Sequence, residues 1–277
     1  MKTVVLTGAS GFVGRALTLY LKYQGVNVIP VSRQRRIDLY HVDNYLDCPE
    51  GDVLIHLAEE PDRSKVNRIG EKYQKESLEL TTVLSKRFNG QVIYASSAVV
   101  YGDRNPFLNT ENSPVEGVDL YSVVKLKNEQ VVLANGGTVA RISNLYGSGM
   151  SKNNVMSDIL LQIPGAGIIK VRDSRPVRDF LFIDDLLTAL SLMIIKSHNG
   201  ILNVGSAEPV SILKLAELIL EVANQKDRKV MSTQSRVGDS INTLDISKTS
   251  KVLGWRPSST LKQHVSKLVL YGVSANG

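Results

Sequence analysis

The stretch Val4–Gly14 (VVLTGASGFVG) decides the expected fold, because it joins an apolar run to a glycine-rich turn. After the turn, apolar residues recur at the spacing of one helical face. They are Val13, Ala16, Leu17, Tyr20 and Leu21. Glycines in a strand–turn–helix unit let the backbone approach a pyrophosphate, and the helix start offers N–H groups and a positive dipole. Glycine turns of this kind are common, and the G-x-x-G-x-x-G spacing differs from G-x-G-x-x-G, so the turn predicts a dinucleotide site only together with other features.

Size and composition are those of an ordinary globular protein with one large or two modest domains. The chain has 277 residues, of which 43% are hydrophobic and 22% charged. Cys48 is the single cysteine, so no internal disulfide forms and a reducing compartment is expected. Glu50 and Asp52 lie close to it in sequence, and such carboxylates raise the pKa of a thiol. We therefore expect Cys48 to be unreactive.

Membrane insertion and nucleic-acid binding are both disfavoured. No segment approaches the roughly 18 apolar residues of a membrane span, and Met1–Leu6 runs into the glycine turn too soon for a signal peptide. We therefore expect a cytoplasmic protein. The net charge is +6, but the basic residues are scattered and aromatic residues make up only 6%. An anionic cofactor and a di-anionic substrate explain this excess equally well.

Strand-like and helix-like segments alternate along the first part of the chain. Strand patterns cover 3–6, 27–31, 53–57, 91–95 and 138–142, and helical patterns cover 11–23, 72–88, 120–134, 185–196 and 212–224. A short third strand is expected near Ile37–Leu39. Such alternation predicts a parallel sheet covered on both faces, and the pattern loosens after Gly147. We predict a dinucleotide-binding domain (1–147 and 179–204) and a smaller mixed α/β substrate domain (148–178 and 205–277).

Three polar side chains form a candidate catalytic group. Tyr121 and Lys125 are four residues apart on a predicted helix, hence one turn apart on the same face. The ordinary pKa of tyrosine is about 10, and a nearby ammonium favours the phenolate. A reduction of ~3 units corresponds to roughly 4 kcal/mol of differential interaction. Ser97 ends a predicted buried strand, where its hydroxyl can bind a carbonyl oxygen. A surface Tyr–Lys pair and a serine that caps the strand are the structural alternatives, but the order of turn, hydroxyl and Tyr–Lys pair is hard to obtain by chance.

These features together resemble the extended short-chain dehydrogenase/reductase family, in its nucleotide-sugar epimerase/dehydratase/reductase group. The matching motifs are Thr7–Gly14, His56–Ala58, Ser97, Tyr121, Lys125, Arg141–Gly147, Arg178–Asp185, Asn203–Gly205 and Leu253–Pro257, spread over nearly the whole chain. The resemblance implies a Rossmann-type doubly wound parallel sheet with a smaller mixed α/β C-terminal substrate domain. It also implies a nucleotide-diphosphate sugar substrate, no metal site and a possible homodimer.

The resemblance also assigns residues to roles. Ser97, Tyr121 and Lys125 would be catalytic. The cofactor would contact Gly8, Ser10, Gly11, Phe12, Val13, Gly14, Ser32, Arg33, Asp38, Leu39, Leu57, Ala58, Tyr121 and Lys125. The substrate would contact Ser97, Asn144, Asn154, Arg178 and Arg236. Asn153 and Asn154 as turn residues, and Arg178 and Asp179 as a surface pair, are the alternatives.

The expected reaction follows from two positions. Dehydratases of this group place an Asp–Glu pair after the strand-end hydroxyl, where this chain has Ala98 and Val99, so dehydration is disfavoured. Ser32 and Arg33 stand where NAD-preferring chains have a carboxylate, which favours NADP(H) over NAD(H), although a basic loop without a cofactor role is the alternative. We expect NAD(P)H-dependent reduction of a nucleotide-linked 4-keto-6-deoxy sugar. An NAD-dependent 4-epimerase and a non-catalytic NADP(H)-binding module are the other candidates. Glu59 departs from the family pattern, because a small residue is usual there.

Overall fold

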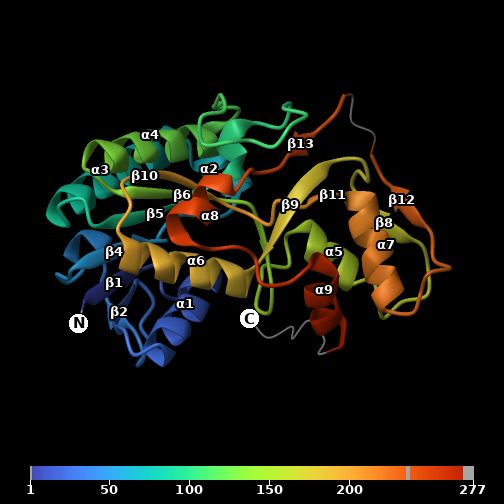
Figure 1. Cartoon of the computed structure of the whole chain (residues 1–277), viewed down its shortest axis with the longest axis horizontal. Coiled ribbons are helices and arrows are strands. Elements are labelled where there is room, and N and C mark those ends of the chain that lie inside the picture. Colours follow the sequence, from blue (N-terminus) through green and yellow to red (C-terminus); the bar gives the residue numbers. More distant parts are fainter. Residues whose placement is uncertain (1, 235–237, 271–277) are drawn as a thin grey trace.

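The computed structural model describes residues 2–234 and 238–270 and confirms the predicted α/β architecture (Figure 1). In these residues, seven parallel strands form one sheet in the order β10-β6-β5-β4-β1-β2-β3. The strands are β1 (Thr3–Thr7), β2 (Asn27–Ser32), β3 (Tyr40–His41), β4 (Val53–His56), β5 (Val92–Ser97), β6 (Thr138–Ile142) and β10 (Gly200–Val204). Strand β1 lies inside the sheet, with β2 on one side and β4 on the other.

Helices cover both faces of this sheet, as Figure 1 shows. They are α1 (Phe12–Tyr23) and α6 (Ile183–Lys196) on one face, and α3 (Glu71–Arg87) and α4 (Leu120–Ala134) on the other. Successive strand residues point to opposite faces, so Val4 belongs to the apolar cluster of Leu17 of α1, whereas Val5 belongs to the cluster of Leu84 of α3. Burial of one such leucine contributes about 2 kcal/mol. This two-sided burial explains the continuously apolar strands.

The direction of the chain reverses at β1, which creates a crevice. The chain passes from β1 outward to β2 and β3, then returns to the other side of β1 as β4. Open α/β sheets bind ligands at such a switch point, outside the carboxyl ends of the strands. Here Thr7 of β1 lies in register with His56 of β4, and Thr7 Oγ1 and His56 Nδ1 form a 2.8 Å hydrogen bond. The site described below lies at this edge.

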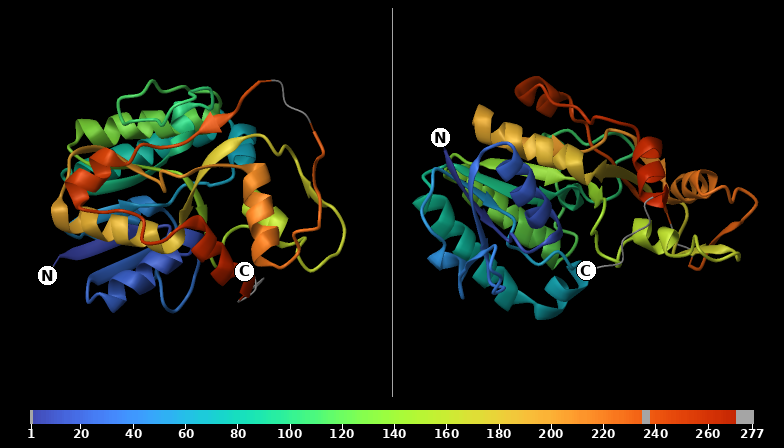
Figure 2. Two further views of the ribbon diagram at one scale, coloured as in Figure 1. Left: turned by 45° about the vertical axis from the view of Figure 1, so that its right-hand side comes forward. Right: turned by 90° about the horizontal axis from the view of Figure 1, so that it is seen from below.

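The later part of the chain builds a smaller region beside the sheet (Figure 2). Its strands are β7 (Asn144–Tyr146), β8 (Ile169–Val171), β9 (Val177–Phe182), β11 (Pro209–Ser211), β12 (Val230–Ser232) and β13 (Ile241–Asn242). Strand β9 pairs with β7, β11 and β13, and β8 pairs with β12. Helices α5 (Val155–Leu160), α7 (Ile212–Val222) and α9 (Leu261–Leu270) surround a separate apolar cluster that includes Ile159 and Leu215. The predicted domain boundaries stay a prediction.

Four more helices lie among the described residues. They are η1 (Tyr45–Asp47), α2 (Arg63–Ile69), η2 (Ala98–Tyr101) and α8 (Ser247–Leu253). The third strand was expected near Ile37–Leu39, but β3 occupies Tyr40–His41, because the preceding residues form an exposed turn in which Arg36 pairs with Asp38. Strand β3 pairs only with Val31 and Ser32. Pro30 therefore has no neighbouring strand on that side and removes no hydrogen bond from the sheet.

Two expectations about single features are tested by the structure. Cys48 is buried, and burial raises the pKa of its thiol, with a smaller contribution from Asp47. The direction is as predicted, but burial and not the neighbouring carboxylates is the main cause. Among residues 2–234 and 238–270, no helix is long and apolar enough to cross a membrane.

Candidate active site

A cleft with a cavity volume of about 1350 Å³ opens at the carboxyl ends of β1, β4 and β5. The glycine turn forms one wall, and the residues after β4, the end of β5 and the start of α4 form another. Many of the predicted site residues line it. They are Gly8, Ser10, Gly11, Phe12, Val13, Gly14, Arg33, Leu57, Ala58, Ser97, Tyr121, Lys125, Asn144 and Asn154.

The glycine turn brings backbone into close contact at two points. Gly8 has φ +74°, and a Cβ there would lie 2.8 Å from the carbonyl carbon of Leu57. A Cβ on Gly14 would lie 2.2 Å from the carbonyl oxygen of Gly8. Helix α1 begins after Gly11 with no side-chain cap and no acidic residue in its first turn. The first N–H groups of α1 are therefore available to an anion in the cleft.

Of the four residues predicted to contact the adenosine end of the cofactor, only Arg33 lines the cleft. Arg33 lines the cleft, with its guanidinium 5.5 Å from the ring centroid of Tyr45. Ser32 is fully buried behind it and donates a 2.9 Å hydrogen bond to Ser10 Oγ. Asp38 accepts two hydrogen bonds from Arg36, which hold the pKa of the Asp38 carboxyl below its ordinary value. Neither Asp38 nor Leu39 belongs to the cleft wall, so the structure does not bring these two to the other candidates.

Local structure brings Ser97, Tyr121 and Lys125 into this one cleft. Ser97 ends β5, and its Oγ accepts a 3.3 Å hydrogen bond from the N–H of Val99. Helix α4 starts at a capping box in which Asp119 accepts from the N–H of Ser122 at 2.9 Å. This cap fixes the first turn, which carries Tyr121. Lys125 lies one turn later, with its Nζ 5.7 Å from the centroid of the Tyr121 ring.

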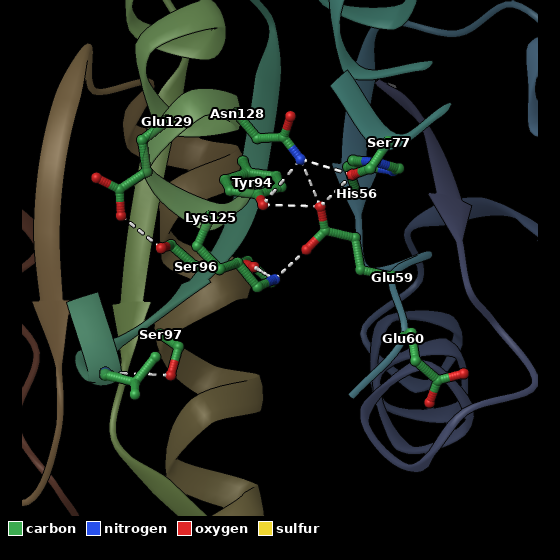
Figure 3. A network of polar contacts seen from close by, with 12 residues as sticks. His56, Glu59, Glu60, Ser77, Tyr94, Ser96, Ser97, Lys125, Asn128 and Glu129 are labelled. Carbon is green, nitrogen blue, oxygen red and sulfur yellow. Dashed lines mark hydrogen bonds and ion pairs between the residues drawn. The ribbon is translucent and has the colours of Figure 1, made fainter. Parts of the chain in front are cut away.

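The Lys125 ammonium is buried in a polar network, which Figure 3 shows from close by. Its Nζ forms an ion pair with Glu59 Oε2 and donates to the carbonyl oxygen of Ala95 at 2.7 Å. The other carboxylate oxygen of Glu59 accepts three hydrogen bonds. Their donors are Tyr94 OH (2.8 Å), Asn128 Nδ2 (2.6 Å) and Ser77 Oγ (3.1 Å).

Sequence reasoning noticed Glu59 as a departure from the family pattern, but it did not find Tyr94 or Asn128. Asn128 carried a usable signal, because it lies seven residues after Tyr121 and three after Lys125, hence on the same face of α4. Tyr94 faces the network from β5, where nothing in the local sequence separates it from a buried core tyrosine.

Burial and pairing determine the ionisation of this network. Burial disfavours both charges, but each partner stabilises the other, so the pKa of Glu59 lies below and the pKa of Lys125 above its ordinary value. Burial lowers the pKa of His56 to about 4, so its imidazole is neutral at pH 7. Burial, followed by the charge of Glu59, raises the pKa of Tyr94 well above 10. The network therefore holds a charged Lys125–Glu59 pair among neutral groups.

The predicted substrate residues are less closely grouped. Asn144 lines the cleft and donates to the carbonyl oxygen of Asp179 at 3.1 Å. Asn154 also lines it, and its side chain caps α5 by accepting from the N–H of Ser157 at 3.0 Å. The alternative of a turn residue thus describes its present contacts.

Arg178 and Arg236 lie elsewhere or outside the described residues. Arg178 donates to Ser240, with Nη2–Oγ at 2.7 Å, lies 4.0 Å from Asp103 and is not part of the cleft wall. Asp179 is fully buried and accepts from the N–H of Ser206 at 2.7 Å, so the surface-pair alternative for Arg178 and Asp179 is wrong. Arg236 lies outside the described residues.

Comparisons with known proteins show which family this sequence and fold belong to. Residues 4–205 match the NAD dependent epimerase/dehydratase family. The chain belongs to this family. It is 29% identical to the GDP-6-deoxy-D-mannose reductase of Pseudomonas aeruginosa (95% of each chain covered). It is 25% identical to a UDP-glucuronic acid decarboxylase of Danio rerio (98% of this chain, 72% of that one). A structure of RMD from Pseudomonas aeruginosa complexed with NADPH superposes with a TM-score of 0.86 at 26% identity (100% of each chain covered).

The nicotinamide cofactor of the epimerase/dehydratase family fits this cleft. The close backbone contacts at Gly8 and Gly14 hold the start of α1 against the ends of β1 and β4, where its first N–H groups are available to a pyrophosphate. Ser10, Gly11 and Phe12 line the cleft at this point. The same cleft extends from Arg33 to Ser97 and Tyr121, so it can hold both ends of a dinucleotide.

Proposed function

We propose that this chain uses NADPH to reduce the keto group of a nucleotide-linked 4-keto-6-deoxy sugar. The observation that carries the proposal is the position of Ser97, Tyr121 and Lys125 in the same cleft as the glycine turn. The reductase named among the relatives, which the chain matches over nearly its whole length, supports it further.

In this proposal Tyr121 donates the proton of its phenol to the C4 oxygen of the sugar as the carbonyl becomes an alcohol. Ser97 Oγ already accepts from the N–H of Val99, so its own O–H proton can be donated to the same oxygen. This second hydrogen bond stabilises the developing negative charge. When bound, the reduced nicotinamide supplies the hydride for C4. Lys125 has three N–H donors, of which Glu59 and Ala95 engage two, leaving one for the cofactor ribose.

The residues after Ser97 argue against elimination from the sugar. Ala98 and Val99 begin η2, directly after β5, and neither side chain can transfer a proton. Dehydration at this site would need another acid and base. Reduction needs only the one proton that Tyr121 supplies.

The preference for NADPH is supported by Arg33. Its guanidinium lines the cleft at the carboxyl end of β2. We propose that it binds a 2′-phosphate there through two parallel hydrogen bonds. For the nucleotide sugar, we propose that Asn144 and Asn154 contact the diphosphate from the opposite side of the cleft. Arg178 and Arg236 remain proposed contacts, and Arg178 would have to exchange Ser240 for the substrate.

The test is a panel of 4-keto-6-deoxy sugars linked to thymidine, guanosine, cytidine or uridine diphosphate, with NADPH consumption as the readout. We expect one member of the panel to consume NADPH in proportion to product. Tyr121→Phe should lower turnover at least ~100-fold while NADPH still binds. Tyr73→Phe is the matched control, because Tyr73 also lines the cleft but its hydroxyl accepts from the N–H of Glu60, and it should keep most turnover.

Two results would contradict the proposal. Interconversion of nucleotide sugars with NAD and no net change in cofactor would identify a 4-epimerase. NADPH binding without turnover of any panel member would indicate a non-catalytic module.

A further inference from the structure

Glu59 occupies a position at which three elements around the cleft each contribute a contact. Its carboxylate joins the loop after β4 to α3 through Ser77, to β5 through Tyr94 and to α4 through Lys125 and Asn128 (Figure 3). The side chain is only 8% exposed although it lies on the cleft wall. Four partners on two oxygens fix the carboxylate in one orientation.

We propose that Glu59 is a positioning residue that holds the Lys125 ammonium in place and balances its charge, so that Tyr121 rests as the phenol, the form that donates a proton. The role of proton donor rests on the proposed reduction. The charge balance itself rests only on the geometry of the network.

The argument begins with Lys125 alone. An uncompensated ammonium whose Nζ lies 5.7 Å from the Tyr121 ring centroid would favour the phenolate strongly in a buried setting. A phenolate can accept a proton but cannot donate one. With Glu59 paired to the ammonium, the two charges form a neutral pair, and their combined effect on the phenol oxygen is smaller than that of Lys125 alone.

The other groups that face this pair do not supply the compensating charge. His56 from β4 is neutral, because burial lowers its pKa to about 4. Tyr73 from α3 is a phenol, because burial and Glu59 raise its pKa to about 12, and Tyr94 from β5 is likewise protonated. Glu60, the next residue along the chain, forms its ion pair with Lys65 (2.5 Å). Among the described residues that contact Lys125, Glu59 is thus the carboxylate that compensates it.

The same network explains the position of Lys125. The ammonium is drawn between Glu59 and the carbonyl oxygen of Ala95, and it lies 5.0 Å from the ring centroid of Tyr94. A lysine side chain has several rotatable bonds, so without these contacts its Nζ would sample many positions. Glu59 therefore determines where the ammonium is as well as how strongly it acts.

The experiment measures tyrosinate absorbance against pH in the full chain, without substrate. Each protein is compared with its own Tyr121→Phe counterpart, so the difference reports Tyr121 alone. We expect Glu59→Gln to move the midpoint of this signal about one pH unit lower, since one buried negative charge is lost. Glu60→Gln is the matched control. It removes the neighbouring carboxylate, which pairs with Lys65, and should leave the midpoint unchanged.

Glu59→Ala is the second variant, because it removes the charge together with the hydrogen bonds of the carboxylate. It should shift the midpoint in the same direction, whereas Glu59→Asp, which keeps the charge, should restore most of the wild-type value. An unchanged midpoint in Glu59→Gln or Glu59→Ala would overturn the proposal. So would an equal shift in Glu60→Gln.

Turnover gives a separate readout. If a substrate is found, Glu59→Gln should move the alkaline limb of the kcat profile to lower pH by the same shift, because the phenol is lost earlier. A shifted midpoint without any reducible substrate would support the charge balance and refute the reduction. NADPH consumption with an unmoved midpoint would refute the role of Glu59 and leave the reduction standing.

Discussion

Helix α4 carries two buried charged residues one turn apart, Lys125 and Glu129, which Figure 3 shows. Each forms an ion pair, and the two pairs lie on different sides of β5. Lys125 pairs with Glu59 beside β4, and Glu129 pairs with Arg141 of β6 (2.6 Å). Both pairs have side chains that are less than one-tenth exposed. Only the first lies on the cleft wall. The Glu129 pair joins a helix to the sheet, whereas in our proposal the Glu59 pair controls the ionisation of Tyr121.

Solvation explains why the two pairs differ in what they contribute. A buried pair repays its desolvation only when its remaining hydrogen-bonding positions are satisfied. Glu129 accepts from two guanidinium nitrogens of Arg141 and from Ser96 Oγ, all from the neighbouring strands. These contacts lie within the sheet and its helix, and of the three residues only Ser96 also lines the cleft. The Lys125–Glu59 pair keeps one ammonium donor for the cleft, and its effect can change when a ligand binds.

The largest expected effect is on stability and comes from the Glu129–Arg141 pair. Glu129→Ala leaves the Arg141 guanidinium buried without its partner, and such losses cost about 3–5 kcal/mol. Urea unfolding followed by circular dichroism measures this. Glu221→Ala is the control, because Glu221 pairs with Lys226 and Lys262 at the surface, where screening by water makes the loss small. Equal losses of stability in the two variants would show that the Glu129–Arg141 pair does not hold α4 to the sheet.

The second prediction concerns the pH dependence of stability near the Lys125–Glu59 pair. Because the Lys125–Glu59 pair is neutral overall, burial dominates the ionisation of His56 and lowers its pKa from 6.5 to about 4. The unfolded chain then binds more protons than the folded one between these values. Stability should therefore fall as the pH drops from 6.5 to 4, by about 3 kcal/mol in total.

His56→Asn should remove this part of the pH dependence. The measurement is the free energy of unfolding at several pH values in both proteins, and the difference between the two curves isolates His56. Curves that stay parallel from pH 6.5 to 4 would mean that the imidazole takes up its proton at the same pH in the folded and the unfolded chain. The Lys125–Glu59 pair would then have an additional charge beside it at low pH.

The comparison also separates what the sequence predicts from what it does not. The strands, the helices and the glycine turn follow from local patterns, because side-chain periodicity and glycine φ angles are properties of consecutive residues. Tyr121 and Lys125 share one helical face for the same reason. Glu59 and its partners Ser77, Tyr94 and Lys125 come from four separate elements, and only the packed fold brings them together.

Arg178 illustrates the same limit among the predicted substrate residues. Its motif is local, but its guanidinium is bound by Ser240, which precedes β13, and β13 pairs with β9 over a long sequence separation. No periodicity predicts such a pairing of two short strands. Asn154 shows a residue with two compatible descriptions, since it caps α5 and also lines the cleft.

The smallest expected effect is on cofactor binding. It concerns a cation on the cleft wall that has no carboxylate partner among the described residues. Within residues 2–234 and 238–270, Arg33 forms no ion pair, and it lies on the cleft wall against the Tyr45 ring. Arg33→Ala should weaken NADPH binding roughly 10-fold, the scale of a lost charge-assisted hydrogen bond, and NADH binding much less. Fluorescence titration with each cofactor measures both. Arg36→Ala is the control, because Arg36 pairs with Asp38 away from the cleft. Equal losses for the two cofactors would mean that Arg33 does not contact a 2′-phosphate, and the choice between reductase and epimerase would then depend on the substrate panel alone.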